Sequence, residues 1–462
     1  MHDEISMPDE VQVPVLIVGG ALVGLSMSLF LAWQGVPSLL VEKHAAPARL
    51  PRVRGHNART MELFRLLGLE EAIRAAQSPM AANRGIVRVE SLAGRELARL
   101  DDGGQGDLSA FTPTTGCIIS QEQLEPLLVE HARKLGGDIR FNTEMISFEQ
   151  DATDVCAVIR ERSNGHTWRV RAHYLIAADG SHSSIRDGLG IQTQRSGMIS
   201  HSLDVVFEAD LHEALRRRHF FMYYVSNPAL PDGLAGLMPL DNQRRWSFGT
   251  PFHPEHGERR EDLTDERCIE LIRIATGVSD LEVNLLPVYP WDSTKVGLWE
   301  LQARYAERYR QQRVFLVGDA AHAILPAGGL GADTGIQDAF NLAWKLALVL
   351  SGKADARLLD SYEEERLPIG KLRVEQTLLR TSYRAGTGER TFLDDAEMIF
   401  GYRYRSSAVL SEAASPSALL TLHPKELCGE PGTRASHLIL QREEEYLSTI
   451  DLCGGKWSCQ LK

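Results

Sequence analysis

The sequence lacks both paired cysteines and an excess of basic residues. Its six cysteines are scattered along 462 residues and none forms a C-x-x-C pair, so we expect a reduced, cytoplasmic protein without a metal site. The formal net charge is -12, which argues against nucleic acid or an acidic membrane as partner, because both favour a basic surface. The acidic first ten residues lack the basic segment of a secretory signal.

Charged residues are also absent between Glu10 and Glu42. Such a run is long enough to cross a bilayer, which takes about 20 apolar residues. Pro14, two adjacent glycines and a turn divide it into pieces, however, so we predict no membrane span. The pieces are typical of the first β-turn-α-β unit of a dinucleotide-binding fold, whose strands and helix are buried on most faces. They are a strand at 13–18, a helix at 22–33 and a strand at 38–41.

The turn of this unit carries a glycine fingerprint. Gly19 and Gly24 hold the first and third places of G-x-G-x-x-G, where a pyrophosphate approaches a helix N-terminus. Ala21 holds the second place, where its methyl group would crowd the phosphates, and Gly20 beside it would relieve part of this crowding. Glu42 lies where an acid binds the ribose of an adenosine without a 2′-phosphate. The alternative is an ordinary tight turn between a strand and a helix.

Two later segments also place polar residues after a strand. In "YLIAADGSHSSIRDGLG", an apolar strand ends in Asp179 and Gly180, and Arg186 follows in the spacing D-G-x-x-S-x-x-R. In "RVFLVGDAAHAILPAGGLGADTGIQDAFNLAWKLALVL", a strand at 313–317 leads to Asp319, then to a glycine-rich turn and a helix beginning near Asp333. Carboxylates at the carboxyl ends of parallel strands lie where such sheets bind ligands. We interpret His322, in the last segment, as a structural histidine.

Together the three segments resemble the FAD-dependent aromatic hydroxylases, the group A flavoprotein monooxygenases built like para-hydroxybenzoate hydroxylase. The resemblance covers about residues 11 to 385 and is nearest to the polyketide-tailoring hydroxylases. "RVRGHNARTMELFRLLGL", with Arg54 and Arg59, and "CIISQEQLEPLL", with Gln121, resemble further family segments, as does "LLDSYEEERLPIG". The implied fold class is α/β, with a Rossmann-like FAD-binding domain and an antiparallel-sheet substrate domain.

The resemblance implies a role for each matched residue. Glu42 would bind the adenosine ribose, Asp179 would help to hold FAD, and Asp319 would bond the ribityl chain. Arg186 is linked to both FAD and NAD(P)H. The other implied cofactor residues are Gly19, Gly20 and Gly24 at the pyrophosphate, Lys43, Arg54, Gln121 and Gly180, and the flavin-face loop with Pro326, Gly328, Gly329, Gly331 and Ala332.

The implied activity is hydroxylation of a phenolic, polycyclic polyketide-type aromatic through a flavin C4a-hydroperoxide, with O₂ and NADPH or NADH. No catalytic side chain is assigned, and no general base is evident. Baeyer–Villiger oxidation, epoxidation and antibiotic inactivation on the same fold stay open as alternatives. So does an impaired flavin-binding protein that assists a partner enzyme. A monomer or a homodimer is compatible with the sequence.

The resemblance also implies a division into domains. The FAD-binding domain would take 11–190 and 296–400, and the substrate domain 191–295 with parts of 80–120. Residues 401–462 resemble the opening of a thioredoxin-like domain that longer relatives carry, so we expect a truncated appendage, either packed on the body or mobile and trimmed early by proteases. The residues predicted to line the substrate pocket are Met222, Tyr224, Leu237, Trp246 and Phe248.

One residue departs from the family at the predicted helix start. The family usually carries Asn where this chain has Asp333. Asp is a good helix N-cap, which is the simpler explanation. Alternatively, a carboxylate near the pyrimidine edge of the flavin would oppose the reduced anion, lower the flavin potential and slow reduction.

Overall fold

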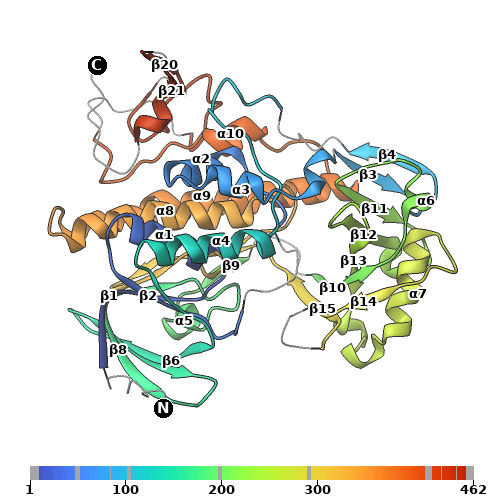
Figure 1. The fold of residues 1–462 in the computed structure, drawn as a ribbon, viewed down its shortest axis with the longest axis horizontal. Helices are drawn as coiled ribbons and strands as arrows, with labels where there is room; N and C mark the ends of the chain where they lie inside the picture. The colour runs from blue at the N-terminus through green and yellow to red at the C-terminus, as the bar shows by residue number, and fades with distance from the viewer. Residues whose placement is uncertain are drawn as a thin grey trace.

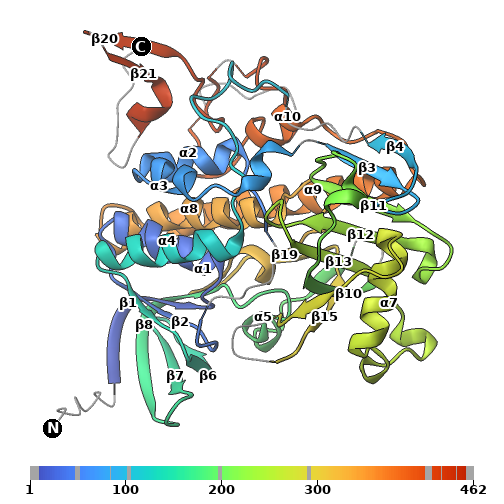
Figure 2. The ribbon, with the colours of Figure 1, turned by 45° about the vertical axis from the view of Figure 1, so that its right-hand side comes forward.

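The computed structural model describes residues 10–46, 53–83, 85–100, 106–195, 200–288, 293–410, 419–427, 429–443 and 445–453. Two large sheets lie at opposite ends of the molecule (Figure 1). Three helices cover one face of the first sheet, side by side (Figures 1 and 2). They are α1 (Leu22–Trp33), α4 (Gln121–Lys134) and α8 (Gly331–Leu350). Among the described residues, no helix combines the length and the apolarity that crossing a bilayer requires.

The first sheet has a parallel core in the order β18-β8-β1-β2-β5. This is a doubly wound arrangement, since β1 has its successor β2 on one side and the much later β8 on the other. The core strands are β1 (Glu10–Val18), β2 (Ser38–Val41), β5 (Asp138–Arg140), β8 (Thr167–Ala177) and β18 (Val314–Leu316). Antiparallel β6 (Thr143–Gln150), β7 (Val155–Glu161) and β17 (Arg310–Gln311) extend it.

The uncharged opening stretch forms the centre of this sheet. Leu16 and Ile17 in β1 are fully buried, as are Leu25 and Leu29 in α1. Helix α1 lacks charges because it lies between the sheet, α4 and α8, with little surface left for solvent. The predicted helix and second strand are confirmed residue for residue, whereas the first strand begins at Glu10, three residues earlier than predicted.

The second sheet is antiparallel except for one pair and has the order β14-β10-β13-β12-β11-β3-β4, with β15 also paired to β10. Helix α7 (Asp265–Thr276) packs on its outer face (Figure 1). The strands are β3 (Ile86–Val89), β4 (Glu96–Leu100), β10 (Ser200–Glu208), β11 (Met222–Ser226), β12 (Leu234–Pro239), β13 (Arg245–Phe252), β14 (Asn284–Leu286) and β15 (Val296–Leu301).

A small third sheet lies where the chain passes between the two large ones. It joins β9 (Thr193–Arg195), β16 (Arg304–Ala306) and β19 (His322–Ala323). Helix α9 (Asp360–Ala385) runs from the helix layer toward the second sheet, where the guanidinium of Arg88 in β3 donates to the carbonyl of Arg384 (Figure 2). The remaining α-helices are α2 (Ala58–Leu66), α3 (Glu70–Ala75), α5 (Ser184–Gly188), α6 (His212–Leu215) and α10 (Asp395–Phe400).

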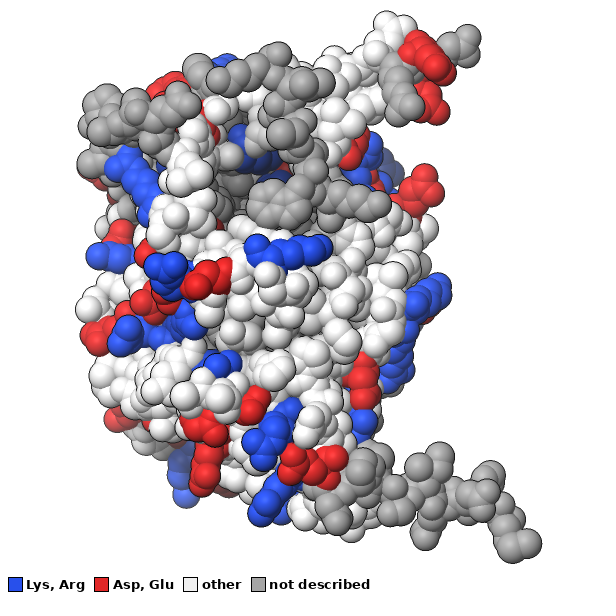
Figure 3. Space-filling model, turned by 90° about the vertical axis from the view of Figure 1, so that its left-hand side faces the viewer, with Lys and Arg blue, Asp and Glu red and all other residues white. Residues whose placement is uncertain are grey.

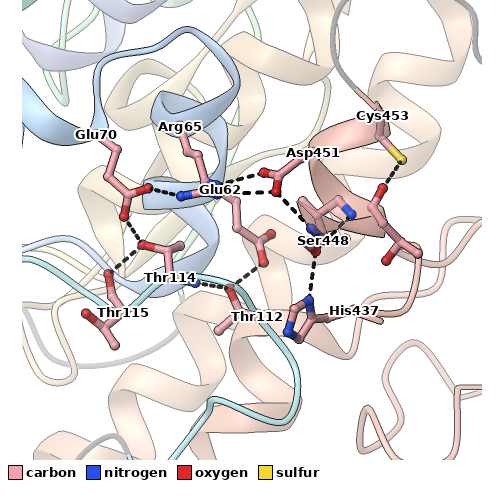
Figure 4. A network of polar contacts seen from close by, with 12 residues as sticks. Glu62, Arg65, Glu70, Thr112, Thr114, Thr115, His437, Ser448, Asp451 and Cys453 are labelled. Atoms are coloured by element: carbon pink, nitrogen blue, oxygen red, sulfur yellow. Dashed lines mark hydrogen bonds and ion pairs between the residues drawn. The ribbon is translucent and has the colours of Figure 1, made fainter. Parts of the chain in front are cut away.

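The C-terminal part packs on the body rather than forming a separate core. It carries the hairpin of β20 (Ile439–Arg442) and β21 (Glu445–Ser448) beside α2 and α3 (Figure 2). Arg434 pairs with the fully buried Glu62 of α2, and Asp451 pairs with Arg65 at 2.7 Å (Figure 4). Of the two predicted alternatives, a packed appendage is therefore what the described residues form. Within the predicted appendage of 401–462, residues 411–418, 428, 444 and 454–462 lie outside the described residues.

Acidic and basic side chains are interspersed on the face drawn in Figure 3, so this face does not carry a field of one sign.

Candidate active site

The three segments singled out in the sequence end at one edge of the first sheet. Val18, the last residue of β1, lies beside Ala177 of β8 and Val41 of β2, and Ala177 in turn lies beside Leu316 of β18. Because these strands are parallel, the loops that follow them leave from the same carboxyl edge. Backbone bonds continue the ladder into the loops, from Ala178 N to Val18 O at 2.8 Å and from Val317 N to Ala177 O at 3.0 Å.

The first loop turns so tightly that two glycines have no substitute. Gly19 has φ +109°, and a Cβ there would lie 2.2 Å from the carbonyl oxygen of Ala178. A Cβ on Gly24 would lie 1.9 Å from the carbonyl oxygen of Gly19. Ala21 is the N-cap of α1, exposed, with an ordinary extended backbone and no side-chain cap. The first amides of α1 thus lack a side-chain cap and face the edge where an anion is stabilised.

Glu42 reaches back to this turn from the end of β2. Its carboxylate accepts hydrogen bonds from the backbone N–H of Gly20 at 2.7 Å and of His44 at 2.8 Å. A Cβ on Gly20 would lie 2.6 Å from Cβ of Glu42, so glycine is needed for this approach as well. The Lys43 side chain, next in sequence, is exposed.

The second loop holds a half-buried carboxylate and a buried guanidinium. Burial raises the pKa of Asp179, and its Oδ1 has no hydrogen-bond partner among the described residues. Arg186 is 3% exposed and donates to the carbonyls of Ser181 and Ala320, so it joins the second loop to the third. Gly180 has φ +87°, and a Cβ added there would meet no atom within 4 Å. Arg186 therefore holds the second loop in position against the third loop.

The third loop begins at Gly318 and Asp319 and leads into α8. The Asp319 side chain is exposed at the sheet edge. Gly318 lies directly under α1, because a Cβ there would come within 2.9 Å of Val23. Further on, Gly328 and Gly329 both take positive φ, at +94° and +66°, in a turn closed by a bond from Gly329 N to Pro326 O. Pro326 is exposed, while Gly331 and Ala332 are half-buried in the first turn of α8.

Helix α8 begins close to the predicted start near Asp333, but Asp333 is not its N-cap. The helix begins at Gly331, so Asp333 is its third residue and cannot be the N-cap. Its carboxylate instead bonds His56 Nδ1 at 2.7 Å and accepts from Asn57 N at 2.8 Å, next to the start of α2. The helix starts early because the two preceding glycines complete the turn, and Asp333 serves to join two helix N-termini.

His322 is a structural histidine, as predicted. Its Nε2 lies 2.7 Å from a carboxylate oxygen of Asp338, whose other oxygen accepts from Arg366 at 2.7 Å. All three side chains are fully buried. Burial opposes ionisation of Asp338, but Arg366 and His322 together hold the pKa of Asp338 below its ordinary value. The cluster ties α8, α9 and the third loop together beneath the candidate site.

Three of the five predicted substrate-pocket residues are core residues instead. Leu237, Trp246 and Phe248 are at most 1% exposed and pack with α7 on the outer face of the second sheet. Side chains alternate along a strand, so residues one position away face the first sheet. Met222 and Tyr224 lie on that inner face and are partly exposed.

The inner face carries a row that sequence reasoning missed. Tyr224, Gly236, Gly249, Asp204 and Gly297 are direct neighbours across five strands. A Cβ on Gly249 would meet nothing closer than 3.6 Å, whereas a Cβ on Gly236 would lie 3.1 Å from the end of the Met222 side chain, so the floor of this face is shallow between Tyr224 and Asp204, chiefly at Gly249. The period-two alternation that identified the strands could have revealed this row, had the small residues been counted with the large ones.

Two polar side chains, one in this row and one beside it, make further contacts. Asp204 accepts a hydrogen bond from the Ser247 hydroxyl at 3.1 Å. Arg54 donates to the carbonyls of Phe221 and Pro239, both at 3.4 Å, and stacks on the Phe221 ring at 3.9 Å. Burial lowers the pKa of Arg54 to about 10, which nearby Tyr224 and Asp204 partly offset, so the guanidinium is still cationic near neutral pH.

A cavity of about 310 Å³ opens between Arg54 and the end of the second sheet. Met80, Ile118 and Leu240 contribute apolar walls, while Glu122 and Arg245 lie at its polar side. The predicted cofactor residue Gln121 lies just behind it, at the start of α4. Its backbone N–H donates to Val53 and its side chain to Glu125 at 2.6 Å.

Comparison with known proteins identifies this arrangement. The family model described as an FAD binding domain matches residues 12–377, which contain all three loops. The chain belongs to this family of FAD-dependent aromatic hydroxylases. Tetracenomycin A2 monooxygenase-dioxygenase of Streptomyces glaucescens is 41% identical over 96% of this chain and 81% of that protein. 4-Methyl-5-nitrocatechol 5-monooxygenase of a Burkholderia species is 40% identical, over 98% and 83%.

Solved structures of flavin hydroxylases have the same fold. Aklavinone-11 hydroxylase, crystallised as a ternary complex with FAD and aklavinone, superposes with a TM-score of 0.86 at 37% identity, over 96% of this chain and 83% of that one. The flavin-dependent monooxygenase PieE, solved with FAD and substrate, gives 0.82 at 31%, over 96% and 84%. The mixed α/β fold expected from the sequence is confirmed, while the thioredoxin-like character of the appendage stays a prediction.

Proposed function

We propose that the protein is an NAD(P)H-dependent FAD monooxygenase that hydroxylates a phenolic, polycyclic aromatic of the polyketide type. The observation that carries this proposal is the convergence of three loops on one sheet edge, at Val18, Ala177 and Leu316. Relatives named for tetracenomycin and aklavinone support the polyketide class. We further propose an intracellular enzyme that works as a monomer or a homodimer, with the predicted domain boundaries and the thioredoxin-like origin of the appendage retained.

The residues present fit FAD. Gly19, Gly20 and Gly24 allow the tight turn that directs the uncapped start of α1 to the sheet edge, where a pyrophosphate would bind, since a Cβ at each would clash with protein atoms that shape the turn. Glu42 would exchange one of its backbone bonds for a ribose hydroxyl. Asp179 offers the buried Oδ1 that has no partner among the described residues. Bound FAD would take a hydride from NAD(P)H and deliver one oxygen atom of O₂ to the substrate ring.

The inner face of the second sheet would hold the substrate. A fused aromatic ring system is flat, and Gly236 and Gly249 admit a flat body where larger side chains would project from the sheet. Asp204 and Tyr224, at either end of the usable floor, would bond substrate hydroxyls. The length of this floor favours a polycyclic substrate over a single ring.

Arg54 would make the substrate more reactive. Its guanidinium is cationic and partly desolvated beside Tyr224 and Asp204, so it would favour the ionised form of a nearby phenol. An ionised phenol is richer in electrons and attacks an electrophilic oxygen more readily. The apolar walls of Met80, Ile118 and Phe221 would exclude water, which protects the oxygen transfer from side reactions.

The test is a coupled assay on the purified protein with a polyhydroxylated anthraquinone as probe. We expect a yellow protein whose NAD(P)H consumption rises with the probe, and a product heavier by one oxygen atom that carries label from ¹⁸O₂. Arg54→Gln should retain FAD and lower the probe-stimulated rate about 100-fold. A protein that does not bind FAD contradicts the proposal. One that binds FAD but stays redox-silent supports the accessory-protein alternative instead.

A further inference from the structure

A group of histidines and carboxylates lies on the second sheet, apart from the sites described above. The turn after β13 reads His253-Pro254-Glu255-His256 and forms a single 3-10 turn. In a 3-10 helix, side chains at i and i+3 lie nearly above one another. The rings of the two histidines are accordingly stacked, with centroids 5.1 Å apart and an interplanar angle of 27°.

Carboxylates surround the first histidine. Nδ1 of His253 lies 2.9 Å from an oxygen of Glu255, and its Nε2 lies 2.9 Å from an oxygen of Asp232. The backbone N–H of His253 donates to Glu258 at 2.6 Å. Two carboxylates thus contact the His253 ring, one at each nitrogen, and a third accepts from the backbone of the same residue.

A third histidine comes from another strand. His201 of β10 is paired directly with Glu300 of β15 and has its Nε2 3.9 Å from that carboxylate. Its Nδ1 lies 3.8 Å from the second oxygen of Glu255. Glu255 therefore lies between the imidazoles of His201 and His253, one on each oxygen.

We infer that this group is a binding site for a divalent transition-metal ion such as Zn²⁺, with His253, Glu255 and His256 as ligands. One ligand atom from each of the three lies within 4.8 Å of the others. Zinc bound by imidazole and carboxylate needs ligand atoms at about 2.0–2.2 Å from the ion, so the three must approach one another by roughly 1 Å. Glu255 and His256 are exposed and free to move that far, and the His256 ring must turn out of its stack on half-buried His253 so that its nitrogen faces the ion.

A fourth ligand is available from His201, whose Nδ1 already lies near Glu255. Asp232 contacts Nε2 of His253, the nitrogen opposite the one that faces Glu255, so it would orient the ring and not bind the ion. Imidazole with carboxylate suits zinc, nickel, copper and cobalt and disfavours calcium and magnesium, which prefer all-oxygen sites. The prediction of no metal site considered cysteine spacing and not this turn, and the groups around the turn come from other segments of the chain.

The position of the site suggests what an ion would do. Strand β10 follows the chain's entry into the second sheet, after β9, and β15 precedes its exit to β16. His201 and Glu300 lie at these two crossings, and the turn at 253–256 packs against them. A bound ion would hold the turn to both crossing strands and so brace the second sheet where it joins the rest of the molecule.

The test uses the full-length, FAD-loaded protein after removal of metals with a chelator. We expect calorimetric titration with ZnCl₂ to give one site with a dissociation constant of roughly 10 µM or tighter. His256→Ala and Glu255→Gln should each weaken it about 10- to 100-fold. Zn²⁺ should also slow hydrogen exchange at 200–203 and 298–301 in the unaltered protein but not in either variant.

The matched control is His212→Ala, which removes an exposed histidine of α6 on the same domain. It should bind zinc like the unaltered protein. Far-UV circular dichroism and flavin content establish that each variant is folded. A dissociation constant weaker than roughly 1 mM, or one that both ligand variants leave unchanged, overturns the inference.

Discussion

At the scale of single residues, the candidate cofactor site depends on space that only glycine leaves. Gly19 and Gly24 sit where a Cβ would overlap backbone oxygens. Backbone atoms cannot rotate away as a flexible side chain can, so the overlap must move β1 relative to β8 or α1. Because β1 and α1 form the proposed pyrophosphate subsite, this shift would also distort that subsite.

Gly19→Ala tests this close approach against Gly35→Ala. Both glycines have positive φ, at +109° and +74°, but Gly35 has nothing within 4 Å of an added Cβ. Gly35→Ala should cost about 1–2 kcal/mol for its backbone alone and keep FAD affinity. Gly19→Ala should cost more than that and weaken FAD binding at least about 100-fold, measured by urea unfolding and by calorimetric FAD titration. Equal FAD affinity in the two variants would contradict the assigned pyrophosphate subsite.

Asp333 provides a second residue-scale prediction. Its carboxylate faces His56 and the amide of Asn57, so part of its charge is offset before it reaches the ring of a bound flavin. Asn can keep the bond from Asn57 and reverse the bond to His56, which makes Asp333→Asn a conservative change. We expect the midpoint potential of the bound FAD to rise by about 30 mV, measured by dye-coupled reduction. An unchanged potential would rule out an electrostatic role for Asp333.

At the scale of elements, the sequence predicted those features that a contiguous stretch of residues determines. Charge-free β1 and α1, and the loops after β8 and β18, could be predicted because each motif is contiguous in the chain. Which face of the second sheet is buried could not be predicted, because Leu237 and Tyr224 are both residue types that line pockets. The packing of α7 on one face is what buries Leu237 and leaves Tyr224 on the other. The contact of Arg434 with Glu62 joins residues far apart in sequence and has no local signal.

The two faces of the second sheet should respond differently to substitution. Gly249→Leu fills the floor of the inner face, and its added Cβ meets only ordinary contacts, so the protein should fold normally. We expect it to raise the KM for a polycyclic substrate at least about 10-fold. Leu237→Ala, on the α7 face, should instead lower stability by about 2–5 kcal/mol with little change in KM. The reverse pattern would place the substrate on the other face.

The docked C-terminal segment should be released by acid. Burial opposes ionisation of Glu62, but Arg59 and Arg434 hold its pKa below the ordinary value of 4.5. A carboxyl whose pKa is lower in the folded than in the unfolded state stabilises the fold above the unfolded value, and this contribution is lost as pH falls through the folded value. Hydrogen exchange at 430–453, corrected for intrinsic rates, should therefore accelerate below about pH 4.

Arg434→Met should release the same segment already at neutral pH. It leaves Glu62 fully buried with fewer partners, which costs about 3–5 kcal/mol. Arg357→Met is the control, since its pair with Asp355 is exposed and contributes little to stability. Exchange at 430–453 that is equal in both variants would show that the ion pair does not hold the segment.

At the scale of the whole molecule, the proposed reaction requires residues of both large sheets at one site. The carboxyl edge of the first sheet presents the glycine turn, Asp179 and Asp319, while the inner face of the second presents Tyr224 and Asp204. Arg54 joins them, since it precedes α2 in the chain and bonds carbonyls of the second sheet. Neither half could bring a cofactor and an aromatic substrate together alone.

The most direct measurement is a crystal structure of the protein grown with FAD. We predict one dinucleotide with its pyrophosphate against Gly19 and Gly24, its adenosine ribose on Glu42, and its ring beside the turn at 326–331. A flavin bound in another cavity, or one that leaves Gly19, Asp179 and Asp319 without contact, would contradict the account.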